Sequence, residues 1–563
     1  MECAQTIAWL AGLRLRWRSI IIASIVIAIA TALVPAAFAE DEHEHRHREL
    51  GPGCAPERRA IAHRAGGVPV RVHEHERAPI PCVTPTSYRA GEASIVVTNE
   101  GTVLFQSVFP EAGLPIGLLR SVDRGATWEF IDPNGDPPRT GSNDMNMWVD
   151  RKSGRVFWSN DIELPVVHVQ RVDYSDDDGM TWFPSSPLPM HFDHTQLFSG
   201  PPTRESRDSI QGPQNIVYAV VSGGFTCGFA PFGFCGTHLT KSLDSGLTWE
   251  PSVALPYPPE CMAAGNNPIG GYGLNGVVGR DAIVYLPFTP CERPYVAISH
   301  DEGSTWQLSL VADTETIGWG ELGLGMDKAG NLYAAWTDSA DRLPYLAISR
   351  DRGQRWSTPL MIGAPGINEA ALPQLVAGAR GQVAVSYYGS KNAPLPFPPP
   401  CITDPPMGDL GFGYLGQPPS LGCPAYENET WDTYVTESFN ALDRHPLFWS
   451  ATLNDPANST WYGFTPSGLR IPEPPPGVTD GFNDRWAIGP NSEATSGRAD
   501  YFGMTIARDN TPWVGFVQAC PFGLPFAGNP NCSQAVGGPN DGAFGLVGRL
   551  VRVGGEDERD DED

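Results

Sequence analysis

An eight-residue pattern, S-x-D-x-G-x-T-W, occurs five times between residues 121 and 356 and constrains the fold more than any other feature of the chain. The copies begin at Ser121, Ser175, Ser242, Ser299 and Ser349, and the last copy has Arg355 in place of threonine. Their starts lie roughly 50 to 70 residues apart, and self-similarity at such a period is typical of repeat architectures. One copy would mean little, but five in series predict five equivalent structural units.

Each copy has the composition of a tight hairpin turn. Its aspartate can accept hydrogen bonds from backbone N–H groups, its glycine can adopt positive φ, and its tryptophan offers a large apolar face to bury. The aspartates are Asp123, Asp177, Asp244, Asp301 and Asp351, and the tryptophans are Trp128, Trp182, Trp249, Trp306 and Trp356. Because a catalytic site is made once per molecule, a carboxylate that recurs in every unit is predicted to be structural.

The pattern resembles the Asp-box, or bacterial neuraminidase repeat, of sialidase-type β-propellers. The resemblance implies an all-β fold of four-stranded blades, with each box in the turn from the third to the fourth strand and the ligand site on the opposite face. Apolar hairpins upstream of the five boxes, and two more at 371–388 and 500–516, predict a single propeller of about seven blades. Six blades are the alternative if one hairpin is an insertion. A short strand near residues 70–72 is expected to complete the last blade.

The N-terminus has the order of a secretory signal peptide. Arg14, Arg16 and Arg18 precede an apolar run at 20–34, and Ala37-Phe38-Ala39 fits a cleavage site before Glu40. An uncleaved membrane anchor is the alternative. The predicted organisation is a signal peptide at 1–39, a His- and acid-rich, largely disordered segment at 40–85, the propeller at 86–553 and an acidic tail at 554–563. The protein is expected to be secreted, periplasmic or at the cell surface.

Ten cysteines remain after the signal peptide, and they fall into neighbouring pairs along the sequence. The simplest of many connectivities joins Cys54 to Cys82, Cys227 to Cys235, Cys261 to Cys291, Cys401 to Cys423 and Cys520 to Cys532. Disulfides of this kind are expected outside the reducing cytoplasm. On the propeller alignment, four of the five pairs lie in loops of the face opposite the boxes, which favours that face for binding.

Charge limits the partners that can be expected. The chain has 38 Lys+Arg against 64 Asp+Glu, a formal net charge of −26, which argues against nucleic acid and anionic membranes. A membrane partner is expected only if the N-terminal segment stays uncleaved. His43, His45, His47, His73 and His75 can attract Zn²⁺ or Ni²⁺, but no cysteine or fixed spacing defines a metal site. No cofactor is required by the sequence.

Carboxylates are predicted to ring one mouth of the central channel, where the first strands of the blades begin. The candidate ligand-binding residues are Glu92, Asp144, Asp193, His194, Glu321, Glu369, Arg485 and Asp500. Such a ring would bind Ca²⁺ or hydrogen-bond a neutral sugar or a cationic group, while the plainer alternative is that polar residues simply begin strands. We therefore predict a module that recognises a glycan or an extracellular protein.

A glycoside hydrolase is the alternative. The resemblance to catalytic sialidases implies an Arg-Ile-Pro motif in the first blade, but the matching stretch here reads Gly91-Glu92-Ala93-Ser94, and a carboxylate there would repel an anionic sugar. Tyr501 falls about where the family's tyrosine nucleophile lies, with Arg498 near it and Glu321 able to polarise it. An exo-sialidase-like enzyme, or another retaining or inverting glycosidase, therefore stays open.

Overall fold

Alternating apolar runs form short β-strands throughout the part of the chain that the structure describes, a computed structural model. The described residues are 50–72, 78–90, 93–106, 117–132, 146–163, 168–189, 195–210, 215–221, 236–262, 275–316, 322–393, 395, 430–462, 503–519 and 543–552. Within them the only helical elements are the 3₁₀ turns η1 (Arg207–Ser209), η2 (Pro259–Met262) and η3 (Pro290–Glu292). None of the described helical turns could cross a bilayer.

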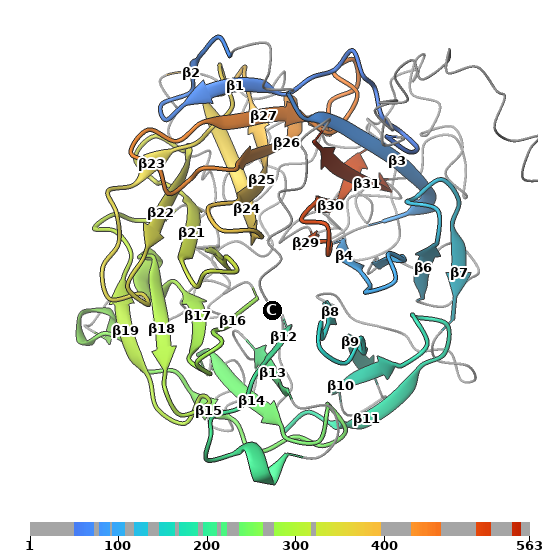
Figure 1. The fold of residues 1–563 in the computed structure, drawn as a ribbon, viewed down its shortest axis with the longest axis vertical. Coiled ribbons are helices and arrows are strands. Elements are labelled where there is room, and N and C mark those ends of the chain that lie inside the picture. Colours follow the sequence, from blue (N-terminus) through green and yellow to red (C-terminus); the bar gives the residue numbers. More distant parts are fainter. Residues whose placement is uncertain are drawn as a thin grey trace, which may run out of the picture. The chain divides into compact units, whose positions relative to one another are not determined.

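The strands form seven antiparallel blades of four strands each around a central axis (Figure 1). In order from the inner to the outer strand, the blades are β4 (Ser94–Val97), β5 (Val103–Gln106), β6 (Leu118–Ser121) and β7 (Glu129–Ile131); β8 (Met147–Val149), β9 (Val156–Glu163), β10 (His168–Ser175) and β11 (Phe183–Pro187); β12 (Gln196–Gly200), β13 (Ile216–Val221), β14 (His238–Ser242) and β15 (Val253–Ala254); β16 (Val277–Val278), β17 (Val284–Phe288), β18 (Tyr295–Ser299) and β19 (Gln307–Leu310); β20 (Gly323–Met326), β21 (Leu332–Thr337), β22 (Pro344–Ser349) and β23 (Leu360–Met361); β24 (Glu369–Ala377), β25 (Val383–Ser390), β26 (Thr430–Ser438) and β27 (Phe448–Thr452); and β29 (Gly503–Ile506), β30 (Pro512–Ala519), β31 (Ala543–Val551) and β3 (Ile80–Arg89). The prediction of an all-β propeller with about seven blades is confirmed.

The inner strands close a ring. Each inner strand contacts the inner strand of the next blade, and β29 of the seventh blade contacts β4 of the first. The core lies between blades, where aromatic side chains such as Trp158, Trp336 and Trp431 are fully buried. Burial of such large apolar surfaces stabilises each interface between blades.

The seventh blade combines the two ends of the chain. β3 pairs with β31 from Ile80↔Val551 to Pro85↔Leu546, so an N-terminal strand completes a blade made of C-terminal strands. The sequence predicted this closure but placed the strand near residues 70–72. The predicted start of the propeller at residue 86 also falls inside β3. Prolines at 81 and 85 obscured the strand, and they are tolerated because the outermost strand of a blade has one unpaired edge.

The N-terminal residues also enlarge the sixth blade. β1 (Ile61–Arg64) pairs with β27, and β2 (Val68–Pro69) pairs with β1, while β28 (Trp461–Tyr462) pairs with β26. Residues 61–69 were predicted to belong to a largely disordered segment. They instead form a hairpin that adds two outer strands to the sheet.

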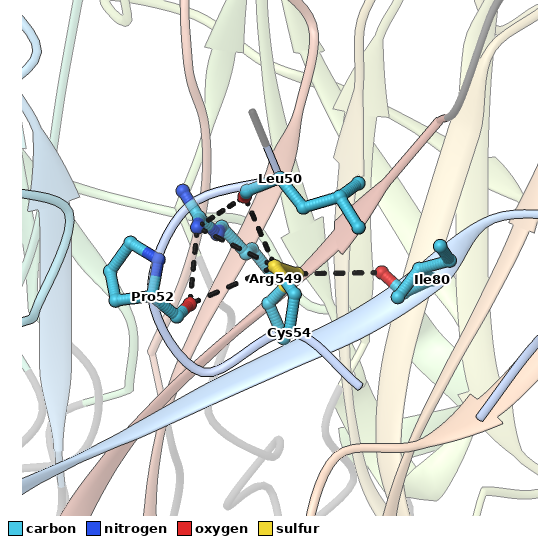
Figure 2. The surroundings of a disulfide bond; sticks show 6 residues. Leu50, Pro52, Cys54, Ile80 and Arg549 are labelled. Atoms are coloured by element: carbon cyan, nitrogen blue, oxygen red, sulfur yellow. Dashed lines mark hydrogen bonds between the residues drawn. A yellow bond between two sulfur atoms is a disulfide. The ribbon is translucent and has the colours of Figure 1, made fainter. Parts of the chain in front are cut away.

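A disulfide and a buried arginine hold the closing strand (Figure 2). Cys54 is joined to Cys82 of β3, which confirms the predicted pairing. Beside it, one Arg549 amino group donates hydrogen bonds to the carbonyl oxygens of Leu50 at 2.9 Å and Pro52 at 3.3 Å. Burial, together with the nearby charge of Arg124, lowers the pKa of Arg549 to about 10. The segment before β1 is thereby attached to both outer strands of the seventh blade.

Candidate functional site

The five S-x-D-x-G-x-T-W turns define one face of the propeller, here called the box-turn face. Each turn joins the third and fourth strands of blades one to five. In the first, Asp123 Oδ1 accepts hydrogen bonds from Ser121 Oγ at 2.8 Å and Thr127 N at 2.9 Å, and Asp123 Oδ2 accepts one from Thr127 Oγ1 at 2.7 Å. The other four turns repeat this arrangement, with Arg355 replacing threonine in the last.

Hydrogen bonding keeps these carboxylates ionised. Partial burial alone would raise the pKa of Asp244, but hydrogen bonds from Thr248, Ser242 and the turn backbone hold that pKa below its usual range. The pKa values of Asp123, Asp177, Asp301 and Asp351 are lowered for the same reason. Because both oxygens are occupied within the turn, these groups have a structural role and little capacity for a ligand.

The same turns join each blade to the preceding one. Gly246 has φ of +84°, and a Cβ at this position would lie 2.5 Å from the Phe157 ring of blade two. Ser245 also has positive φ, as in a type I′ turn. Trp249 Nε1 donates a hydrogen bond to Ser185 Oγ of blade two at 3.3 Å, and Trp356 Nε1 donates one to Ser309 Oγ of blade four at 3.1 Å. The box-turn face is therefore committed to holding the blades together at these positions.

The opposite face, here called the upper face, carries the starts of the inner strands and the connections between second and third strands. A disulfide joins Cys261, after blade three, to Cys291 in a loop of blade four, as the sequence predicted. Next to it, Thr316 N donates a hydrogen bond to Glu292 O at 2.6 Å. These contacts connect the upper loops of blades three and four.

The connection continues into blades five and six. Ser339 N donates to Glu315 O at 2.9 Å, and Thr314 Oγ1 donates to Asp338 Oδ2 at 2.6 Å. Ala370 N, at the start of β24, donates to Arg342 O at 2.7 Å. Covalent and hydrogen-bonded contacts thus run without interruption along the upper face from blade three to blade six. We call this chain of contacts the upper belt.

Glu369 is the one predicted ligand-binding residue that the structure describes. It begins β24 at the upper end of the inner strand, where the sequence placed it, but its side chain is only 2% exposed. Arg342 Nη1 donates a hydrogen bond to Glu369 Oε1 at 2.9 Å and covers it from blade five. Glu369 is therefore part of an ion pair between two blades. Arg342 was not predicted, because its partner lies in another blade and only the fold brings the two together.

Exposed carboxylates lie beside this ion pair on the upper belt. Glu292 and Glu315 are exposed, and partial burial followed by the charge of Glu315 raises the pKa of Glu292. Asp338 is half-buried in the same belt. The described part of the upper face over blades four and five is thus rich in carboxylates that hydroxyl or ammonium groups can reach.

Most of the predicted site lies outside the described residues. This holds for Glu92, Asp144, Asp193, His194, Glu321, Arg485, Arg498, Asp500 and Tyr501, and for Cys227, Cys235, Cys401, Cys423, Cys520 and Cys532. In the part of the chain that is described, no group of three or more His, Cys, Asp or Glu is placed to hold a metal ion.

No protein-family model and no curated protein matches the chain. Among solved structures, a protein of unknown function from Dyadobacter fermentans is similar with a TM-score of 0.37 and 13% identity, over 84% of this chain and 98% of that one. A Penicillium chrysogenum α-L-arabinanase complexed with arabinobiose has a TM-score of 0.35 and 14% identity, over 54% and 91%. The NanB sialidase of Streptococcus pneumoniae has a TM-score of 0.34 and 12% identity, over 77% and 65%. At these identities the similarity concerns the propeller fold alone.

Proposed function

We propose that this protein is an extracytoplasmic recognition module that binds a neutral or cationic glycan through its upper face. The observation that carries the proposal is the upper belt, in which a disulfide and backbone hydrogen bonds join the loops of blades three to six. Loops held in this way lose little conformational entropy when a ligand binds, which favours affinity.

The chemistry of the belt favours polyhydroxyl ligands. Carboxylates such as Glu292 and Glu315 accept hydrogen bonds from sugar hydroxyls, and Arg342 can donate them. An anionic sugar would meet uncompensated negative charge there and is disfavoured. The box-turn face is a weaker candidate because its recurring carboxylates already accept hydrogen bonds within their own turns.

Binding of purified protein to an array of neutral, amino and acidic glycans tests the proposal. We expect neutral or amino glycans to be retained, and the Glu292→Gln/Glu315→Gln double variant to weaken binding at least tenfold by removing two acceptor charges. The matched control is Glu205→Gln/Asp208→Asn, which makes the same charge change at exposed positions of the box-turn face.

Two results would contradict the proposal. Equal weakening by the test and control pairs would show that net charge, and not the upper belt, determines binding. Turnover of a chromogenic glycoside that is lost in Tyr501→Phe or Glu321→Gln would instead establish the hydrolase alternative.

A further inference from the structure

A basic patch lies on the box-turn face of blades five to seven, although the whole chain has a net charge of −26. Its members are exposed cations in turns of this face or at the lower end of β31: Lys328, Arg350, Arg380, Arg444, Arg508 and Arg552. The two strand-connecting turns of an antiparallel four-stranded blade fall at the same end, which brings these residues to one surface.

Printed contacts show that these turns adjoin one another. Lys328 N donates a hydrogen bond to Gly378 O at 2.9 Å, joining the inner turns of blades five and six. Arg350 donates to Leu442 O in the outer turn of blade six. Gln382 Nε2 donates to Asn510 O at 2.8 Å, joining blades six and seven. The patch is therefore continuous across three blades.

Few charges in these turns oppose the patch. Asp327 is only 3% exposed, and its carboxylate accepts hydrogen bonds from Asn331, Tyr333 and Gly381. Burial raises the pKa of Glu437 to about 8, so this carboxyl is mostly neutral at pH 7. Among the described residues of the same turns, the exposed carboxylates are Asp443 and Asp509. Six exposed cations thus face two exposed carboxylates.

An acidic segment of the chain begins at the edge of the patch. Arg552 lies over the Phe439 ring at 4.6 Å, and the next turn residue but one, Ala441, donates its N–H to Gly381 O beside Arg380 at 2.9 Å. Residues 554–563 read GGEDERDDED, with seven carboxylates and one arginine. Ten residues span at most about 33 to 36 Å when extended. Since neighbouring strands are about 4.8 Å apart, this length suffices to reach from β31 across the inner turns.

We propose that the acidic segment 554–563 docks on the basic patch of its own chain. Each exposed ion pair is weak, but several act together, and the direct covalent connection gives the segment an effective concentration in the millimolar range. The interaction is between exposed charges and is therefore sensitive to salt, since the screening length falls from about 30 Å at 0.01 M to about 10 Å at 0.1 M.

A labelled synthetic peptide with the sequence of residues 554–563 tests the docking by fluorescence anisotropy. We expect it to bind a chain truncated after Gly554 at 20 mM salt, at least tenfold more weakly at 300 mM salt, and at least fivefold more weakly to the full chain, in which the segment competes. In the truncated chain, Arg380→Glu/Arg508→Glu should reduce affinity at least tenfold. The control Arg204→Glu/Arg207→Glu makes the same charge change in exposed residues of blade three and should alter it less than twofold.

Three outcomes would overturn the proposal. The peptide could fail to bind the truncated chain, or the two double variants could weaken binding equally. Equal affinity of the peptide for the full and truncated chains would mean that the patch serves an external polyanion, and not this segment. Circular dichroism spectra of all variants confirm that each remains folded.

Discussion

At the residue scale, the box glycines have two separate reasons to be glycine. Positive φ is one, and it applies equally to Gly330 in the inner turn of blade five, where a Cβ would meet nothing within 4 Å. The second reason is contact with the preceding blade, and it applies to Gly246 but not to Gly330. The sequence indicated the first reason only, since the second depends on a residue of another blade.

Substitution of these two glycines by alanine separates the two effects. We expect Gly330→Ala to destabilise the protein by about 1 to 2 kcal/mol through left-handed backbone strain. Gly246→Ala should cost about 1 to 3 kcal/mol more, because the added Cβ overlaps the buried Phe157 ring. Urea unfolding midpoints of both variants provide the measurement. Equal midpoints would mean that the box turn does not hold the blades together.

At the element scale, β1 is anchored to the sixth blade by a directional chain of hydrogen bonds. His63 Nδ1 contacts Arg64 O at 3.0 Å, so this nitrogen donates and Nε2 accepts from Ser450 Oγ at 2.7 Å. Ser450 Oγ in turn accepts from Thr436 Oγ1 at 2.6 Å.

The far end of this chain fixes its direction. Thr436 accepts from Tyr387 OH at 2.9 Å, and Tyr387 accepts from the Ala364 N–H at 2.8 Å. Because the chain ends at a backbone donor and a backbone acceptor, protonation of His63 at Nε2 would leave a buried hydroxyl without an acceptor. The chain as observed therefore requires neutral His63.

Acid is expected to weaken the docking of β1. Burial lowers the pKa of His63 below its usual 6.5, and the hydrogen bond to Arg64 O only partly opposes this. The undocked state then binds a proton more readily, so the stability of docking is complete above about pH 6.5 and falls as the pH decreases through the lowered pKa. The charged groups near this strand are Arg64, which donates to His445 O, and exposed His445.

Amide hydrogen exchange measures this effect. After correction for intrinsic rates, protection of β1 should decrease between pH 7.5 and pH 5, while protection of β24 and β25 stays constant. His63→Gln, which cannot titrate, should abolish the pH dependence. If the variant keeps the same pH dependence, exposed His445 is the responsible group.

At the scale of the whole molecule, the two described disulfides close loops of similar length but do different work. Cys54 and Cys82 are 28 residues apart and secure the closing strand β3, whereas Cys261 and Cys291 are 30 residues apart and join upper loops. In the chain-entropy model, loops of this length stabilise a protein by about 3 to 4 kcal/mol each. The energies should therefore be alike while the locations of their effects differ.

Paired serine variants distinguish the two disulfides. Cys54→Ser/Cys82→Ser and Cys261→Ser/Cys291→Ser should lower the unfolding midpoint by similar amounts, each relative to wild type. Only the first pair should increase hydrogen exchange in β3 and β31, because only this disulfide attaches the N-terminal segment to the seventh blade. Increased exchange in β3 with the second pair would contradict the assigned roles.

The sequence by itself determined the blade plan of this protein, because box turns and alternating hairpins are encoded by residues that are neighbours along the chain. It also placed Glu369 at the upper end of its strand and identified two local disulfides. Only the tertiary structure decided that β3 closes the ring and that Arg342 covers Glu369. The same is true of Arg549 and the carbonyl of Leu50, which are 499 residues apart. Contacts between distant residues depend on how the blades pack, and no local pattern records them.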